Sequence, residues 1–277
     1  MIQIDTMSLD SIGPQAVWVP EGRGMSERPV QEDDRRNPSA GRGNNMPEAC
    51  ASCPFQDGGL CGAVRDARSS RRRRKTDGTV RARQNLFRAG EESGRVAVIR
   101  DGWAVRFTHV PDGRRQVLSI LTPGDIAGAE FIMRPSIRVP VQALTDLSYC
   151  AFDVQELKEI GSEDPGLVWS FLEICAAGRK EVESRLVDLG RRNAEQRLAR
   201  LIAELHRRLS GRGLADGMSI PFPLRQQTIA DALGLTQVHV SRVMSSFREN
   251  DIVQVNGGRL HILDMEALLD IAEIYRR

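Results

Sequence analysis

Residues Arg225–Asn250 read RQQTIADALGLTQVHVSRVMSSFREN, and this stretch gives the clearest indication of fold in the chain. It predicts two short amphipathic helices that meet at Gly234, whose backbone freedom suits a tight corner. The first helix is expected over about 226–233, and Thr236 is well placed to cap the second. The apolar residues recur at helical spacing and are expected to face inward: Ile229, Ala230, Leu233, Val240, Val243 and Phe247. Corner, cap and apolar face together favour a helix-turn-helix over a generic helical hairpin with a solvated polar face.

The outward face of the second helix carries side chains that can contact DNA. The candidate DNA-binding residues are Gln237, Val238, His239, Ser241 and Arg242. An arginine in this position can donate two hydrogen bonds to guanine O6 and N7 in a major groove. The segment therefore predicts that double-stranded DNA is a partner.

Length and composition narrow the possible classes. With 277 residues the chain can form about two domains, each with its own buried core. Because the net charge is only +2, affinity for nucleic acid has to come from locally placed arginines and not from an overall positive field. No apolar run approaches a membrane span of roughly 18 residues, and the N-terminus lacks a signal-peptide core. We therefore expect a cytoplasmic protein with no membrane partner.

The sequence does not predict an enzyme, because it contains no paired acid and base, nucleophile motif or phosphate-binding loop. It does contain five cysteines. In a reducing compartment structural disulfides are disfavoured, so clustered cysteines indicate metal or redox chemistry.

Along the chain, residues 1–46 show no sustained periodicity and are expected to be largely disordered. The cysteine segment follows, and then the basic run 71–75, which is interpreted as a solvated face rather than a nucleic-acid contact. Between about 80 and 152, short apolar segments alternate with Asp-Gly and Pro-Gly turns. That pattern predicts an antiparallel β-barrel or jelly roll.

A long helix is expected to begin at Asp164-Pro165, because proline is tolerated in a first turn. Its apolar residues recur every three or four positions, which predicts parallel pairing of two such helices in a homodimer. The alternative is that the helix packs only on its own barrel. The expected dimer-interface residues are Phe171, Ile174, Gly178, Val182 and Leu186.

The helix is expected to break at Gly190 and Asn193, and 194–209 predicts a further amphipathic helix. After the helix-turn-helix, residues 252–262 predict a hairpin wing, and the last residues are expected to be helical. The fold class is therefore α+β: an N-terminal jelly-roll barrel, a long helix and a C-terminal winged helix-turn-helix.

This order of elements resembles the Crp/Fnr family of bacterial transcription regulators. The most specific segments are LFRAGE at 86–91, PGD at 123–125, NAEQRL at 193–198 and the stretch 229–242. The resemblance implies a cyclic-nucleotide-binding-type barrel and a homodimer on a palindromic promoter site, with RNA polymerase as a further partner. It divides the chain into an N-terminal extension (1–46), a cysteine-bearing sensor barrel (47–163), a dimerisation helix (164–190) and a DNA-binding domain (191–277).

The cysteines follow the pattern C-x2-C-x7-C at Cys50, Cys53 and Cys61, with Cys150 expected at the end of the last barrel strand. Three thiolates from one glycine-containing loop and a fourth from the barrel suit a [4Fe–4S] cluster. A structural zinc site has comparable spacing, and unligated core cysteines remain a third interpretation. Cys175 lies outside the pattern and is interpreted as a small apolar filler.

This layout looks like the oxygen-sensing Fnr branch, in which three N-terminal cysteines and one barrel cysteine hold the cluster. By position the resemblance assigns Cys50, Cys53, Cys61 and Cys150 as ligands of one cluster per subunit. It implies that an intact cluster favours the paired, DNA-competent state, and that oxygen weakens it. A regulator of the same architecture with zinc, another small-molecule effector or no effector is the alternative.

Two departures from related patterns matter. Glu130 and Arg138 are present, but not at the spacing that the family's cyclic-nucleotide branch uses, so a nucleotide is not the expected signal. In the Fnr branch the recognition helix usually carries glutamate where this chain has Val238. Because valine cannot accept a hydrogen bond from a cytosine amino group, we expect an altered choice at one base pair of each half-site.

Overall fold

The computed structural model describes residues 50, 53–67 and 75–274. The predicted disordered extension 1–46, residues 71–74 of the basic run and residues 275–277 at the C-terminus lie outside the described residues. None of the helices in the described part of the chain is both long and apolar enough to cross a bilayer.

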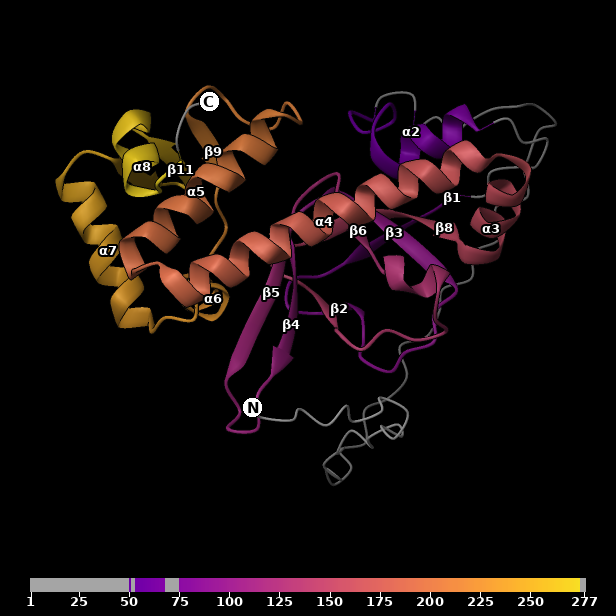
Figure 1. Ribbon diagram of the computed structural model, residues 1–277, viewed down its shortest axis with the longest axis horizontal. Coiled ribbons are helices and arrows are strands. Elements are labelled where there is room, and N and C mark those ends of the chain that lie inside the picture. Colours follow the sequence, from indigo (N-terminus) through magenta and orange to yellow (C-terminus); the bar gives the residue numbers. More distant parts are fainter. Residues whose placement is uncertain (1–49, 51–52, 68–74, 275–277) are drawn as a thin grey trace, which may run out of the picture. The chain divides into compact units, whose positions relative to one another are not determined.

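The sensor part contains the following elements in chain order, most of which are labelled in Figure 1. They are α2 (Gly59–Asp66), β1 (Lys75–Val80), β2 (Asn85–Phe87), β3 (Arg95–Asp101), β4 (Ala104–His109), β5 (Arg115–Leu121), β6 (Ile126–Ala127), the short 3-10 helix η2 (Ala129–Ile132), β7 (Val141–Ala143), β8 (Leu147–Asp153) and α3 (Val154–Glu163). The elements that follow are α4 (Pro165–Arg191), α5 (Ala194–Ser210), β9 (Ser219–Pro221), α6 (Gln226–Leu233), α7 (Gln237–Glu249), β10 (Val253–Asn256), β11 (Arg259–Ile262) and α8 (Met265–Ile271).

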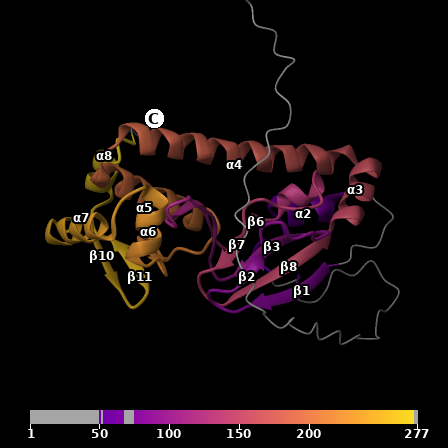
Figure 2. The ribbon, with the colours of Figure 1, turned by 90° about the horizontal axis from the view of Figure 1, so that it is seen from below.

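Strands β1–β8 form two four-stranded antiparallel sheets, in the orders β1-β8-β3-β6 and β2-β7-β4-β5. This arrangement confirms the predicted jelly roll of short strands. Figure 2 shows β1 and β8 side by side at one edge of the first sheet. Their pairing brings the start of β1 beside the last barrel strand, and this contact positions the candidate metal site.

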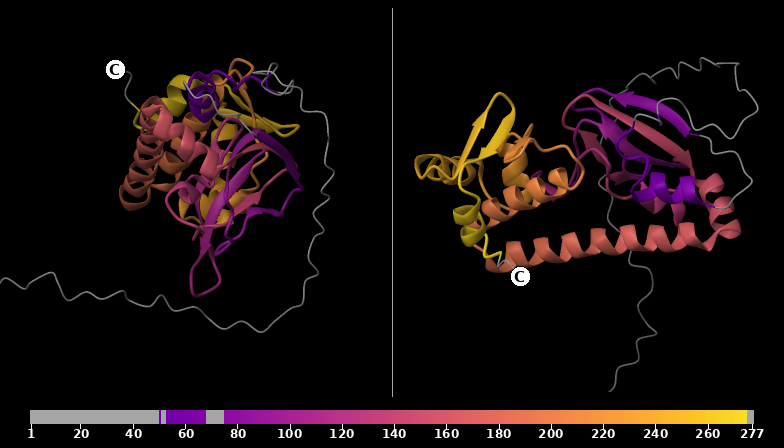
Figure 3. Two further views of the ribbon diagram at one scale, coloured as in Figure 1. Left: turned by 90° about the vertical axis from the view of Figure 1, so that its right-hand side faces the viewer. Right: turned by 90° about the horizontal axis from the view of Figure 1, so that it is seen from above.

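The long helix α4 begins where the sequence predicted. The Asp164 carboxylate accepts from the Gly166 backbone N–H at 2.8 Å and caps the helix. The helix ends at Arg191, and Asn193 then caps α5 in a reciprocal capping box with Gln196. Figure 3 shows α4 as one continuous helix with α2 beside it.

The helix-turn-helix is confirmed in detail. Helix α6 spans the predicted residues 226–233, and Gly234 has φ +63° at the corner. The Thr236 side chain accepts from the His239 N–H at 3.2 Å, so the predicted cap is present. The wing is the hairpin β10–β11, with Gly257 and Gly258 at positive φ in its turn.

Buried side chains form two apolar cores. One lies inside the barrel and includes α2 residues such as Leu60 and Val64. The other fills the winged helix-turn-helix and extends onto β4 and β5 through Phe107 and Val117. The cysteine-bearing helix is therefore part of the barrel core and not a separate appendage.

Candidate functional site

The four predicted ligand cysteines are all buried. The exposed fraction is 2% for Cys50, 8% for Cys53 and 5% for both Cys61 and Cys150. Cys61 lies on α2, so part of the predicted loop is helical. Cys150 lies in the middle of β8 rather than at its end, which corrects the sequence prediction. Cys175 is exposed on α4, so the prediction that it fills an apolar gap in this chain is wrong.

Three of the four thiols lie around the ammonium group of Lys75. Its Nζ donates to Cys50 Sγ at 3.3 Å and to Cys61 Sγ at 3.5 Å. Cys150 is near enough to raise the pKa of Lys75, and Cys53 is near enough to Cys61 to raise the pKa of that thiol. The structure thus places Cys50, Cys61 and Cys150 near Lys75 and Cys53 near Cys61, although Cys61 and Cys150 are 89 positions apart (150 minus 61).

Burial and the charge of Lys75 shift the pKa values of the Cys61 and Cys150 thiols in opposite directions. Burial raises the pKa of Cys61, and Lys75 offsets part of that effect. Burial also raises the pKa of Cys150, to about 12. Burial alone would lower the pKa of Lys75, but the charges of Cys61, Cys150 and Cys50 outweigh it and raise that pKa above its ordinary value. Sulfur and ammonium therefore stabilise each other's charged forms.

Strand register explains how Lys75 reaches this position. In the β1–β8 pair Lys75 lies opposite Phe152, and Asp77 lies opposite Cys150. Residues two apart on a strand share a face, so Lys75 and Cys150 point to the same side of the sheet. The interpretation of the basic run as a solvated face is therefore wrong for Lys75, its last residue. Sequence reasoning missed this contact because nothing in the run signals where β1 begins.

The four candidate ligands are of the chemical type that an iron–sulfur centre requires. All four donors are cysteine sulfurs, which is the ligation that [4Fe–4S] clusters use. Within the described ranges, no three His, Cys, Asp or Glu side chains are arranged around a position for a single metal ion. The position between Cys50 and Cys61 is occupied by the Lys75 ammonium.

One glycine of the cysteine segment is required by a close backbone approach. A Cβ added at Gly62 would lie 2.6 Å from the Asp57 carbonyl oxygen, a distance that real Cβ contacts do not reach. Gly59 adopts φ +52°, which favours glycine at the first residue of α2. The predicted role of the glycines between Cys53 and Cys61 thus applies at Gly59, and Gly62 is a further position that was not predicted.

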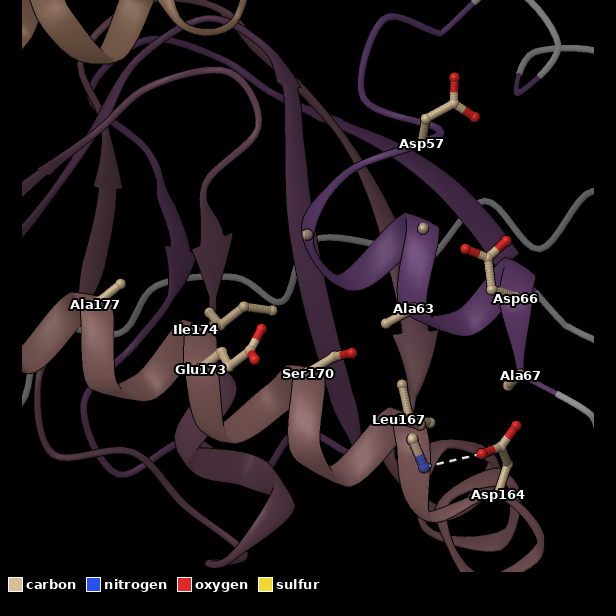
Figure 4. A pocket seen from close by; sticks show the side chains of 13 residues that line it. Asp57, Ala63, Asp66, Ala67, Asp164, Leu167, Ser170, Glu173, Ile174 and Ala177 are labelled. Atoms are coloured by element: carbon tan, nitrogen blue, oxygen red, sulfur yellow. Dashed lines mark hydrogen bonds between the residues drawn. The ribbon is translucent and has the colours of Figure 1, made fainter.

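Helix α2 lies against the long helix α4. A cavity of about 550 Å³ separates parts of the two helices (Figure 4). Its walls include Asp57, Ala63 and Asp66 from the cysteine segment and Ser170 and Glu173 from α4. None of the four cysteines lines it, so this cavity is distinct from the thiol cluster.

Glu130 and Arg138, the residues considered for cyclic-nucleotide recognition, have different surroundings. Glu130 is paired with Arg106 of β4, so its carboxylate already has a cationic partner. Arg138 is exposed.

The candidate DNA-binding residues share the outer face of α7. Gln237, Val238, His239 and Arg242 are exposed, Ser241 is half-buried, and 58% of Val238 is accessible. The inward residues Val240, Val243 and Phe247 are buried as predicted. The helix therefore presents the predicted side chains without using them for packing.

The expected dimer residues divide between two faces of α4. Gly178, Val182 and Leu186 are exposed, whereas Phe171 is half-buried and Ile174 packs against the barrel core. The exposed apolar residues of α4 are Val168, Trp169, Leu172, Val182, Leu186, Val187 and Leu189. The structure thus assigns Ile174 to packing within the subunit, in line with the alternative kept for this helix.

Contacts between the barrel and the helix-turn-helix segment were not predicted. Arg212, which follows the end of α5, donates to Asp125 Oδ1 at 2.6 Å and to the Pro123 carbonyl at 2.8 Å, and Arg208 of α5 also pairs with Asp125. A Cβ added at Gly124 would lie 3.1 Å from Phe55 and 3.3 Å from Arg212, so both side chains rest on this glycine. The turn 122–125 therefore contacts the cysteine segment on one side and α5 on the other.

Two family descriptions match the regions just described. The Crp-like helix-turn-helix domain matches residues 196–271, and the cyclic nucleotide-binding domain matches residues 78–164. The chain belongs to the Crp/Fnr family. It is a DNA-binding transcription regulator and not an enzyme.

Relatives of this Crp/Fnr protein are named as a transcriptional activator and as an anaerobic regulatory protein. It is 28% identical over 229 residues to the transcriptional activator protein FnrL of Cereibacter sphaeroides, covering 80% of this chain and 91% of the relative. It is 27% identical over 192 residues to the anaerobic regulatory protein of Haemophilus influenzae, covering 69% and 74%. The solved structure of FixK2 from Bradyrhizobium japonicum superimposes with a TM-score of 0.66 at 25% identity, covering 71% of this chain and 96% of that one.

Proposed function

We propose that this Crp/Fnr protein is an oxygen- or redox-responsive regulator whose DNA affinity is controlled by one [4Fe–4S] cluster per subunit. The observation that carries the proposal is that four cysteines of the cysteine segment and β8 are buried, with Cys50, Cys61 and Cys150 near the ammonium group of Lys75. The names of FnrL and of the anaerobic regulatory protein support the same signal.

In this proposal Cys50, Cys53, Cys61 and Cys150 hold the cluster, which supplies an oxygen-sensitive inorganic core when bound. The protein transmits the change through α2, because Cys61 lies on this helix and α2 packs against α4. Leu60 and Val64 of α2 pack in the barrel core, while the cavity lies between α2 and α4, so a shift of α2 would be transmitted to both. If the cysteines no longer held the cluster, the surface of α2 against which α4 packs would therefore change.

We assign residues 47–163 to the sensor part, 164–190 to dimerisation and 191–277 to DNA binding. Two subunits pair along α4 and place their α7 helices in successive major grooves of a palindromic site, about 34 Å apart. Arg242 reads guanine, and Gln237, Val238, His239 and Ser241 complete the contact surface. RNA polymerase is the further partner, and the site of action is the cytoplasm, where the chromosome is.

The test is metal analysis of protein purified without oxygen. We expect straw-brown protein with about four iron atoms per chain that loses its colour in air and at the same time loses affinity for its operator. Colourless protein that contains one zinc per chain would replace the oxygen-sensing role with a structural one. Metal-free protein with unchanged operator affinity in air would remove the cluster from the account.

A further inference from the structure

Lys75 contacts the candidate metal site directly from the start of β1. Its Nζ donates to two of the four sulfurs, those of Cys50 and Cys61. On another side the same group lies 5.1 Å from the centroid of the Phe152 ring, within cation–π range. The ammonium is thus held in place by contacts that all belong to the site.

The charge of the site explains why a cation is needed there. Thiolates that ligate iron bring negative charge into the protein, and buried charge without a partner is costly. Among the described residues, Arg100 also lies near Cys150, but it is 3.7 Å from Asp77 and donates to Ser148. Because Asp77 is the negative group opposite Cys150, Arg100 and Asp77 largely compensate each other. Within this part of the chain, Lys75 is the cation that donates directly to the sulfurs.

We propose that Lys75 is the charge-compensating residue of the cysteine centre. Its ammonium offsets the negative charge of the four sulfurs, and so increases the affinity of the site for iron and favours the more reduced state of the bound centre. The inference rests on the proposed function, since it requires that the cysteines ligate iron. Lysine acts here as a point charge, and the hydrogen bonds to Cys50 and Cys61 fix its place.

The test compares three substitutions in the full-length protein, reconstituted with iron and sulfide without oxygen. Lys75→Met keeps the length of the side chain and removes its charge, and Lys75→Arg keeps the charge. Lys158→Met is the matched control, because Lys158 is exposed on α3. One measurement is the rate of iron loss to a chelator under argon. The other is the midpoint potential for uptake of one electron, with dithionite as the electron donor.

We expect Lys75→Met to lose iron about tenfold faster than wild type. Its midpoint potential should fall by about 60 mV, the equivalent of a tenfold change for a one-electron couple. Lys75→Arg and Lys158→Met should stay within about twofold of wild type. Failure of Lys75→Met to load iron, with normal loading of Lys75→Arg, supports the inference equally.

Two results would overturn the role of Lys75 while leaving the cluster in place. One is a Lys75→Met protein that matches Lys158→Met in both measurements. The other is a Lys75→Arg protein as defective as Lys75→Met, because side-chain shape and not charge would then be required. If wild-type protein itself binds no iron–sulfur centre, the proposed function fails and the role of Lys75 fails with it.

Discussion

Gly62 lies where the backbone of the cysteine segment leaves no space for a side chain. Alanine favours a helix over glycine by up to about 1 kcal/mol, so propensity alone predicts that Gly62→Ala stabilises α2. The contact of 2.6 Å with the Asp57 carbonyl opposes this, and overpacking of that kind costs about 1–3 kcal/mol. We expect a net loss of stability and a lower anaerobic iron content, measured by thermal unfolding and metal analysis.

The matched control is Gly190→Ala. Gly190 also lies in a helix, but a Cβ added there meets nothing within 4 Å. Propensity should dominate at this position, so stability should rise or stay unchanged. If both substitutions behave alike, close approach at Gly62 does not shape the cysteine segment.

The exposed side chain of Val238 leads to a prediction about which base pair the protein prefers at one position of each half-site. Its side chain is 58% exposed on α7, so a glutamate there would reach the groove without disturbing the core. Glutamate accepts from the cytosine amino group, whereas valine offers only apolar contact to a thymine methyl group. Val238→Glu should change discrimination at one base pair of each half-site by about 1–3 kcal/mol.

The measurement is a series of operator sequences, each with one base pair replaced, bound by wild type and by Val238→Glu. A general charge effect of glutamate would weaken binding to every sequence alike, so only the ranking of sequences matters. Identical rankings for both proteins would refute the role of position 238.

Individual residues also show the limit of sequence reasoning. The cap at Thr236 and the corner at Gly234 were predictable, because both depend on neighbours within three or four positions. The role of Lys75 was not, because it depends on the pairing of β1 with β8, which brings Lys75 and Cys150 to the same side of the sheet from 75 positions apart (150 minus 75).

Helix α4 carries more exposed apolar surface than a helix of a single subunit requires. Five exposed apolar residues follow one another at spacings of four, ten, four and three positions, so they share one side of the helix: Val168, Leu172, Val182, Leu186 and Leu189. Burial of one such side chain stabilises by about 1.5–3 kcal/mol, and a symmetric pair contributes it twice. This side is where the proposed dimer would form.

Leu186→Glu should therefore weaken the dimer by roughly 3–6 kcal/mol, a hundredfold or more in dissociation constant. Sedimentation velocity over a concentration series measures it. Lys180→Glu, an exposed charge change on the same helix, is the control and should leave association within a few-fold of wild type. Equal association of all three proteins would place the interface elsewhere.

At the level of elements, periodicity predicted the helices α4 to α7 and the wing, whose positions are fixed by local caps and turns. It did not predict that Ile174 faces the barrel while Leu186 faces outward. Both residues fit a helical repeat, and only the packing of the barrel against one side of α4 separates them.

Across the molecule, the turn 122–125 joins the cysteine segment to the DNA-binding part. Phe55 follows Cys53 by two positions and packs against Gly124, against which Arg212, just after α5, also packs. Arg212 and Arg208 in turn form ion pairs with Asp125. Such long-range ion pairs left no local signal in the sequence, because the partners lie more than 80 positions apart.

This connection predicts that Phe55→Ala uncouples the signal from DNA binding. Coupling free energies between sites are typically about 1–3 kcal/mol, or roughly 5- to 150-fold in affinity. We expect the iron content of anaerobic Phe55→Ala to equal that of wild type. The ratio of anaerobic to aerobic operator affinity should be at least about fivefold smaller in Phe55→Ala than in wild type. An unchanged ratio at equal iron content would exclude this route.

Cys150→Ser tests the central claim most directly, because Cys150 is the ligand that joins the barrel to the cysteine segment. The measurement is anaerobic iron and sulfide content per chain, with Cys175→Ser as the control since Cys175 is exposed and outside the cluster. The account predicts that Cys150→Ser retains well under half of the iron of wild type and binds its operator weakly, whereas Cys175→Ser loads about four iron atoms. Full iron loading and full operator affinity in Cys150→Ser would contradict it.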